Sequence, residues 1–289
     1  MSGKPLPSWQ LPTGVSRATW DYLQSEHIAG EYDEYFADSA LMRLDMQVLR
    51  QRLPPVDTAE ASAQPCVIAD LGCGTGRVAS ELLPLGYHMV NVDLSPAMLR
   101  EVEAKTPAEY RHRSRCVSAN LVELDQVLEP ASLDWAVCLF SSLGMIRGRQ
   151  YRRRFLSGVR QSLKPGGTLF VHVHNRYRSL LDPGGPAWLA RSWLTSHWDR
   201  NSEFGDRIYS YRRLPKMFLH IYSRRELRQD LRFAGLQNVT IHPIDSTGAK
   251  LLPPSWLAHP IRAGGYFAFA SRSSPKSFSA SQRLTCQTG

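Results

Sequence analysis

The strongest chemical signal in this chain is a run of alternating glycines, Asp70-Leu71-Gly72-Cys73-Gly74-Thr75-Gly76, between an apolar run and a helical pattern. Glycines in such a turn let the backbone bend sharply and approach a ligand with no Cβ in the way. The G-x-G-x-G spacing differs from the G-x-G-x-x-G of dinucleotide folds and from the G-K-[ST] of the P-loop. Because the carboxylate of Asp70 would repel a phosphate, the turn is predicted to bind a positively charged ligand. A plain turn without a ligand is the alternative.

A second carboxylate follows one predicted strand later. Val90-Asn91-Val92-Asp93 ends in an acid at about 20 residues after the glycine turn, the position from which an acid binds ribose hydroxyls in doubly wound folds. The alternative role for Asp93 is to cap the next helix, but Ser95, directly before Pro96, already fills that position. Asp93 is therefore the second predicted ligand-binding residue.

Predicted strands and helices alternate from residue 65 onward, as short apolar runs and periodic apolar positions between turn signals. The predicted strands are Cys66–Ala69, His88–Val92, Arg115–Val117, Asp134–Phe140, Thr168–His174, Val239–Ile244 and Tyr266–Ala270, and the predicted helices are Arg77–Leu83, Pro96–Ala104, Gln150–Leu163 and Ser223–Ala234. Lys164-Pro165-Gly166-Gly167 is predicted as a separate turn. The alternation predicts an α/β fold with a doubly wound, mostly parallel seven-stranded sheet that binds ligands at the carboxyl ends of its strands.

Three segments flank or interrupt the α/β domain, which is predicted over residues 65–272. Residues 1–64 have helical spacing and predict an N-terminal helical extension or lid that ends in a short linker, 58–64. Residues 176–220 break the alternation with P-G-G-P and three tryptophans, which predicts an insertion after the fifth strand, over one edge of the sheet and on the substrate side. The Ser-rich residues 273–289 predict a disordered tail.

The order of these motifs resembles that of the class I S-adenosylmethionine (SAM)-dependent methyltransferases. The resemblance is carried by Asp70 to Gly76, Asp93, Asn120-Leu121, the strand Asp134 to Phe140 and Leu163-Lys164-Pro165-Gly166-Gly167. It covers residues 65–175 and the closing strands, and it implies a Rossmann-like domain that uses SAM and no metal. It does not specify the acceptor.

The resemblance implies cofactor-binding roles for residues from several predicted loops. They are Asp70, Gly72, Cys73, Gly74 and Gly76 at the methionine part of SAM, Asp93 at both ribose hydroxyls, Leu94 under the adenine, Asn120 and Leu121 at the adenine edge, Phe140 and Ser141 under the methyl-transfer site, and Tyr32 with Tyr35 in an N-terminal lid. Many family members carry Asp where this chain has Asn120, whose amide oxygen can still accept a hydrogen bond from the adenine amine.

A general base is optional for this chemistry. Methyl transfer from a sulfonium is an in-line displacement, in which alignment and desolvation supply most of the acceleration. The candidate bases are His172, His174, Asn175, His197, Tyr211 and His220. His174 and Asn175 are the best placed because the carboxyl end of their strand faces the ligand cleft. The sequence pairs none of the histidines with an orienting acid, and a packing or surface role is the alternative for each.

Aromatic residues are concentrated in the predicted insertion. They are Trp188, Trp193, Trp198, Tyr209, Tyr211 and Phe218. They are predicted either to wall an acceptor pocket or to form the core of the insertion itself.

Composition bounds the partners and the compartment. The formal net charge is +9, and arginines cluster at 111–115 and 147–154. A solvated basic surface is the favoured interpretation, with RNA binding as the alternative. The five cysteines are scattered, which predicts free thiols in a reducing compartment and no metal ligands. No apolar stretch approaches the length of a membrane span, so a cytoplasmic location is expected.

These observations lead to one main functional hypothesis and two alternatives. The main hypothesis is a methyltransferase that acts on an oxygen or nitrogen of a small-molecule acceptor. The alternatives are an RNA methyltransferase, for example one acting on tRNA, and a non-catalytic SAM-binding module. Steeply salt-dependent RNA binding would favour the first alternative.

Overall fold

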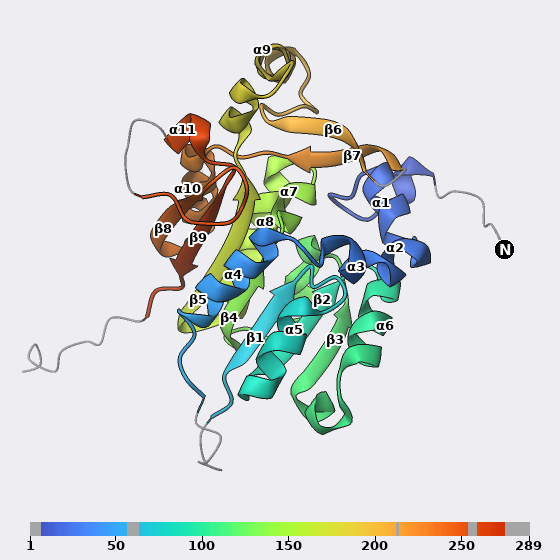
Figure 1. Ribbon diagram of the computed structural model, residues 1–289, viewed down its shortest axis with the longest axis vertical. Helices are drawn as coiled ribbons and strands as arrows, with labels where there is room; N and C mark the ends of the chain where they lie inside the picture. Colours follow the sequence, from blue (N-terminus) through green and yellow to red (C-terminus); the bar gives the residue numbers. More distant parts are fainter. Residues whose placement is uncertain (1–6, 57–63, 212–213, 254–258, 275–289) are drawn as a thin grey trace, which may run out of the picture.

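The computed structural model describes residues 7–56, 64–211, 214–253 and 259–274 (Figure 1). Seven strands form one sheet in the order β3-β2-β1-β4-β5-β9-β8. Strands β1 to β5 pair in parallel, and β9 is antiparallel to both β5 and β8. The predicted doubly wound, mostly parallel seven-stranded sheet is confirmed.

The strands and helices follow the predicted alternation with small shifts at their ends. The strands are β1 (Val67–Leu71), β2 (His88–Asp93), β3 (Ser114–Ser118), β4 (Leu133–Cys138), β5 (Leu163–His174), β6 (Asp206–Tyr211), β7 (Leu214–His220), β8 (Gln237–Ile244) and β9 (Gly265–Ser271). The α-helices are α1 (Arg17–Leu23), α2 (Glu26–Gly30), α3 (Tyr32–Phe36), α4 (Ala40–Arg50), α5 (Arg77–Leu82), α6 (Pro96–Lys105), α7 (Ser142–Met145), α8 (Arg149–Ser162), α9 (Gly185–Trp198), α10 (Arg224–Phe233) and α11 (His259–Arg262). Short 3₁₀ helices are η1 (Ser8–Gln10), η2 (Leu83–Leu85), η3 (Ala108–Arg113), η4 (Leu121–Gln126) and η5 (Arg176–Leu181).

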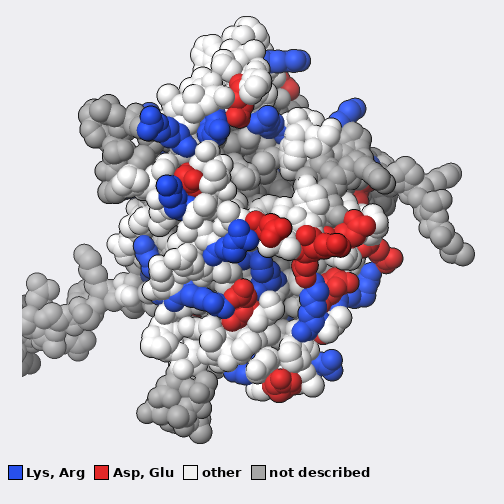
Figure 2. Space-filling model, viewed as in Figure 1, with Lys and Arg blue, Asp and Glu red and all other residues white. Residues whose placement is uncertain are grey.

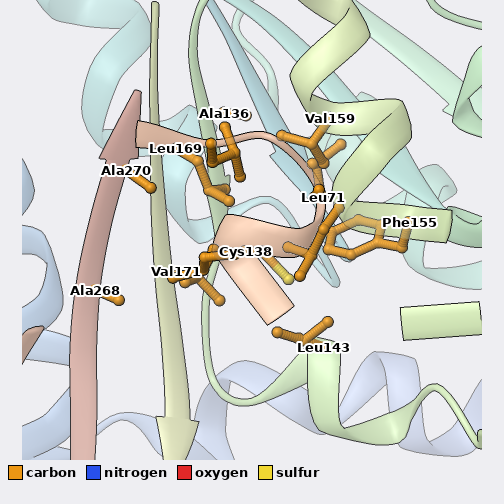
Figure 3. Close-up of a cluster of buried hydrophobic side chains, with 14 of the residues drawn as sticks. Leu71, Ala136, Cys138, Leu143, Phe155, Val159, Leu169, Val171, Ala268 and Ala270 are labelled. Atoms are coloured by element: carbon orange, nitrogen blue, oxygen red, sulfur yellow. The ribbon is translucent and has the colours of Figure 1, made fainter. Parts of the chain in front are cut away.

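The sheet buries an apolar layer on each face. On one face, Leu71, Cys138 and Val171 pack against Phe155 and Val159 of α8 (Figure 3). On the other face α4 and α5 cover a second cluster, which includes the stacked rings of Phe170 and Phe269, 4.5 Å apart. Helices on both faces leave only the strand ends free for a ligand.

A buried ion pair fixes α4 against α5. Asp45 has no exposed surface, and its two carboxylate oxygens accept hydrogen bonds of 2.8 and 2.9 Å from Arg77. Burial raises the pKa of Asp45 to about 6 although Arg77 opposes the shift. This ion pair therefore joins α5, the first helix after the glycine turn, to α4 of the N-terminal segment.

The segment Lys164–Gly167 is part of strand β5, so the prediction of a separate turn is wrong. Leu133 of β4 pairs with Leu163, and Trp135 pairs with Thr168, so four residues of β5 bulge opposite one residue of β4. Gly166 takes a left-handed φ of +84° in this bulge, and the ammonium of Lys164 donates to Asp134 at 2.7 Å. The proline and glycines form a β-bulge, which keeps the strand continuous.

The insertion lies across the carboxyl ends of the strands and not along one edge of the sheet as predicted (Figure 1). It contains η5, α9 and the hairpin β6–β7, and β7 packs against α1 and α7. Two of its tryptophans are exposed, Trp193 at 50% and Trp198 at 81%, so these two do not form a core, whereas Phe218 is buried. The side chain of Tyr211 lies outside the described part of the chain.

Other segments predicted from composition also lie outside the described residues. They are most of the linker 58–64 and most of the tail 273–289. Within the described part of the chain, no helix is long and apolar enough to cross a membrane.

Candidate functional site

The glycine turn stands between β1 and α5 in a left-handed backbone conformation that requires glycine. The φ angles of Gly72 and Gly76 are +82° and +84°. A Cβ on Gly72 would stand 2.8 Å from the hydroxyl oxygen of Ser142, and a Cβ on Gly76 would stand 2.9 Å from a methyl of Val102. Gly74, with a φ of +54°, has no neighbour closer than 3.9 Å on that side. The flanking glycines close the turn, and Gly74 faces open space.

Asp93 holds the turn from the end of β2. One of its carboxylate oxygens accepts a hydrogen bond from the backbone N–H of Gly74 at 2.9 Å, and the other accepts from Ser95 at 2.8 Å. Burial raises the pKa of Asp93, while these backbone donors oppose the rise. Each oxygen retains lone-pair capacity, and Asp93 lines the adjoining pocket, so a ribose diol fits against it.

Asp70 is buried at the end of β1, with 3% of its surface exposed. Burial raises its pKa to about 7, and Arg77 opposes this shift. A buried carboxylate that ionises near neutral pH favours a nearby ligand cation because that cation would relieve its desolvation. Cys73 in the same turn is buried, and burial raises the pKa of its thiol, so it is a poor nucleophile.

Gly72, Gly74 and Asp93 border an apolar pocket of about 120 Å³, whereas Asp70, Cys73 and Gly76 do not line it. Of the residues predicted to bind cofactor, it is lined by Tyr32, Gly72, Gly74, Asp93, Leu94, Asn120 and Leu121. The sequence reasoning missed the other lining residues, which are Gly14, Val15, Thr19, Tyr22, Leu23, Met98, Val122, Ser142, Met145 and Ile146. Met98 lies in the first turn of α6, the helix that directly follows Asp93 and Leu94, a position that could have identified it. The residues from 14 to 23 had no local signal beyond helical periodicity.

The N-terminal helices close this pocket. Asp33 of α3 accepts hydrogen bonds from the hydroxyl of Thr75 in the glycine turn and from Lys105 of α6. The ring of Phe36 lies 4.8 Å from that of Tyr32 and 4.8 Å from that of Phe140. A ligand in the pocket would therefore lie beneath residues of α1 and α3.

Asn120 has both ends of its amide engaged. Its oxygen accepts from the N–H of Val122 at 3.1 Å and its nitrogen donates to the carbonyl of Thr13 at 2.9 Å. Asn120 therefore caps η4 and holds the N-terminal segment against the pocket. Its predicted contact with an adenine amine stays a prediction that requires Asn120 to share or release the bond to Val122.

Phe140 and Ser141 follow β4 with left-handed φ angles of +50° and +66°. Non-glycine residues in this region carry strain that is usual at functional sites. Ser141 is 1% exposed, and its hydroxyl has no hydrogen-bond partner in the described part of the chain. Neither residue lines the pocket, whereas the next residue, Ser142, does.

The histidines of β5 are neutral, with His172 buried and His174 half-buried. The rings of His172 and His174 are 5.1 Å apart. Burial lowers the pKa of His174 to about 4 and lowers that of His172 further below its usual value. Asn175 donates to the carbonyls of Pro260 and Ala263 at 2.8 and 2.7 Å, so it ties β5 to α11. His174 is a weak base, and Asn175 has its amide fully engaged. His197 lies exposed on α9 with its ring bonded to the carbonyl of Trp193.

His220 is paired with two acids, which the sequence did not reveal. Its ring nitrogens lie 2.7 Å from an oxygen of Asp206 and 2.9 Å from an oxygen of Glu226. Burial lowers the pKa of His220 and raises that of Asp206. Glu203, His220 and Glu226 also bring ligand atoms within 4.8 Å of one another. Arg152 forms a salt bridge with Glu203, and Arg176 forms one with Glu226. The two glutamates are therefore already neutralised by arginines of the chain.

Arg147 and Arg154 are exposed, but Arg149, Arg152 and Arg153 are paired with acids, so the interpretation as a solvated basic surface is wrong for these three. Arg152 has no exposed surface and donates to Glu203 at 2.6 Å. Arg149 and Arg153 both donate to one oxygen of the buried Asp230, at 2.9 and 2.8 Å. The arginines sit three and four residues apart on α8, and they meet acids from the insertion and from α10 that are far away in sequence.

Comparison with known proteins agrees with this geometry. Residues 69–169 match a family model described as a methyltransferase domain. Ubiquinone biosynthesis O-methyltransferase of Xanthomonas campestris pv. campestris (strain B100) is 29% identical over 114 residues, which are 38% of this chain and 43% of that protein. The chain spans less than half the length of this relative and of other curated relatives that it matches.

Solved structures share the fold at low identity. A SAM-dependent methyltransferase from Methanosarcina mazei has a TM-score of 0.59 at 16% identity, over 79% of this chain and 98% of that chain. The 1,6-didemethyltoxoflavin-N1-methyltransferase of Burkholderia thailandensis, solved with its namesake compound and S-adenosylhomocysteine, has a TM-score of 0.53 at 17% identity, over 92% of this chain and 93% of that chain.

Proposed function

We propose that this chain, a member of the class I SAM-dependent methyltransferases, transfers the methyl group of SAM to an oxygen or nitrogen atom of a small-molecule acceptor. The observation that carries the proposal is the meeting of the glycine turn, Asp93 and the apolar pocket at the carboxyl ends of β1 and β2. The apolar lining suits an adenine, Asp93 suits a ribose, and the buried charge of Asp70 suits a cationic cofactor.

The chemistry requires little from the protein beyond position. When bound, SAM supplies a methyl group that an acceptor lone pair can attack in line. The residues of this chain bind and orient: Asp93 accepts from hydroxyls, Gly74 leaves room for close approach, and Tyr32 excludes water. Positioning and desolvation of this kind account for most of the acceleration in such reactions. The neutral His174, the engaged Asn175 and the acid-paired His220 support a mechanism without an essential histidine base.

Calorimetry on the purified chain tests the cofactor half of the proposal. SAM and S-adenosylhomocysteine are expected to bind in the micromolar range, on the order of −8 kcal/mol, and NADH is expected not to bind. Asp93→Ala and Gly74→Arg should abolish binding because they remove the hydroxyl acceptor and fill the open space of the turn. Glu109→Ala, an exposed acid on η3, is the control and should bind as the parent does. NADH binding in place of SAM would refute the proposal.

The transfer step requires a second measurement. Formation of S-adenosylhomocysteine from SAM over a panel of small hydroxyl, carboxyl and amine acceptors should identify at least one substrate. SAM binding without turnover over any acceptor would support a non-catalytic SAM-binding module. RNA methylation remains the second catalytic hypothesis because of the net charge of +9. The face shown in Figure 2 supports it poorly, since acidic side chains gather over α3 between the basic ones.

A further inference from the structure

The apolar pocket described above is called the cofactor pocket from here on. A second hollow, which we call the arginine cleft, adjoins it. Its volume is about 1040 Å³, and its charged lining residues are Arg147, Arg149, Arg176, Arg200, Arg225, Glu203 and Glu226. The backbone N–H of Arg147 donates to the carbonyl of Gly14 at 2.8 Å. Gly14 and Val15 line both the cleft and the cofactor pocket, so one chain segment forms a wall of each.

The acids that face the cleft are already neutralised. Glu203 is bonded by Arg152, and Glu226 is bonded by Arg176 and by His220. Arg149 is bonded to Asp230 behind the cleft wall. Because both glutamates are already paired, neither forms a salt bridge with Arg147, Arg200 or Arg225.

Three of these guanidinium groups make no salt bridge in the described part of the chain, although Arg147 interacts electrostatically with Asp199 and Asp206. Arg147 makes a cation–π contact with Phe218, 5.8 Å from the ring centre, and Arg200 and Arg225 are exposed. In addition, Arg176 is only 4% exposed, and its buried Nε has no hydrogen-bond partner among the described residues. An unpaired arginine is a bidentate donor suited to phosphate and carboxylate.

Two helix N-termini add positive potential to the same cleft. α8 begins there at Arg149, whose N–H is bonded to Glu203, and α10 begins there at Arg224 with its first turn capped by Ser223. Anions bind favourably at such helix ends. The site already accepts one oxyanion, because the carboxylate of Glu203 accepts a hydrogen bond from the N–H of Arg149 at 2.5 Å.

Aromatic rings line the cleft beside the arginines. Tyr177 and Phe204 stand edge to face with their ring centres 6.5 Å apart, and Arg176 lies over the ring of Phe204. The cleft thus offers rings to an organic group and arginines to an anionic group. Its volume, about 1040 Å³, is slightly above the range of about 300–1,000 Å³ that small-molecule sites occupy.

We propose that the arginine cleft binds a small organic ligand through a phosphoryl or carboxylate group held by Arg147, Arg200 and Arg225. Because the cleft and the cofactor pocket share the wall Gly14–Val15, the ligand is the methyl acceptor. This last step rests on the proposed function, whereas anion binding itself does not.

Calorimetry with two simple anions tests the site. Inorganic pyrophosphate and citrate represent the phosphoryl and carboxylate sources, and the tighter of the two identifies the source. Arg200→Gln and Arg225→Gln should each weaken that anion about tenfold, the loss of one charged hydrogen-bonded pair. Arg115→Gln, an exposed arginine on β3 at the far edge of the sheet, is the matched control and should change nothing. SAM affinity should be equal in all four proteins, which separates failure of the cleft from failure of the cofactor site.

Two results would overturn the proposal. One is anion binding that Arg115→Gln weakens as much as the cleft variants do, or no anion binding at all. The other is tight, steeply salt-dependent binding of a single-stranded RNA 20-mer that Arg200→Gln and Arg225→Gln weaken, which would assign the cleft to nucleic acid. The assignment to the acceptor has its own test: pyrophosphate or citrate should bind equally well in the presence of saturating S-adenosylhomocysteine, and mutual exclusion would refute it.

Discussion

The cofactor pocket and the arginine cleft share a wall but are built in different ways. The pocket is shaped by the backbone conformation of left-handed glycines and by a carboxylate that accepts from two backbone N–H groups. Mostly apolar side chains complete its lining. The cleft is formed by long charged side chains from α8, α10 and the insertion, which meet only in the folded state. The first kind of site can be recognised from short motifs of consecutive residues. The second kind depends on residues that are distant in sequence.

This difference predicts how each region responds to mutation. A backbone-built site loses binding when a side chain is added. A charge-built site loses stability when one member of a buried pair is removed, because the partner is left as an uncompensated charge. The four predictions below test the two behaviours, from the largest expected effect to the smallest.

Arg152→Ala is expected to have the largest effect, on stability. Arg152 is fully buried and bonded to Glu203, so its loss should cost about 3–5 kcal/mol of unfolding free energy. Urea denaturation measures this. Arg154→Ala, two residues along α8 and exposed at 3.9 Å from Asp125, should have little or no effect. Equal, small losses in both variants would mean that the buried network is not a stabilising unit.

Gly72→Ala is expected to damage the backbone-built site. The added Cβ would meet Ser142 at 2.8 Å in a backbone with a φ of +82°, so stability should fall by about 1–3 kcal/mol and SAM binding should be lost. Gly30→Ala places its Cβ in open space within α2 and should be neutral or slightly stabilising. Thermal unfolding measures the change in stability, and calorimetry measures SAM binding. SAM binding retained by Gly72→Ala would show that the turn is not part of the cofactor site.

SAM affinity should depend on pH through Asp70. The pKa of Asp70 is raised to about 7 by burial, so the carboxyl is protonated below that pH and ionised above it. Only the ionised form attracts a cation, so SAM affinity should rise with pH and be about tenfold higher at pH 8 than at pH 6. Titration calorimetry across this range measures it. Asp70→Asn should flatten the profile, and a slope that survives this change would assign the titration to another group.

Tyr32→Ala should have the smallest effect. Tyr32 lines the pocket and lies in the aromatic contact with Phe36, so its loss should weaken SAM by about fivefold, the equivalent of one aromatic contact. Tyr35→Ala removes a neighbouring ring that is 57% exposed and does not line the pocket, and it should leave the SAM affinity unchanged. The same loss in both variants would point to a general loosening of α3.

The sequence predicted what local spacing determines. The glycine turn, the carboxylate at the end of β2 and the alternation of strands and helices follow from turn chemistry and apolar runs, and the fold they predict is confirmed. Asn120 was predicted to bind cofactor, but its contacts with Thr13 and Val122 depend on where the N-terminal segment lies. The partners of His220 and Arg152 come from the insertion and from α10, and no spacing rule brings such residues together.

The shared carboxylate of Asp230 has a mechanical consequence. One oxygen of Asp230 binds arginines one helical turn apart on α8, so α10 is pinned to a single axial position along α8. Sliding by one turn, about 5.4 Å, would break at least one of these two bonds to the buried carboxylate. The two helix ends that line the cleft therefore move as one rigid wall. The residues after α9 also bond to this wall, because Glu203 accepts from the N–H of Arg149 and from the side chain of Arg152.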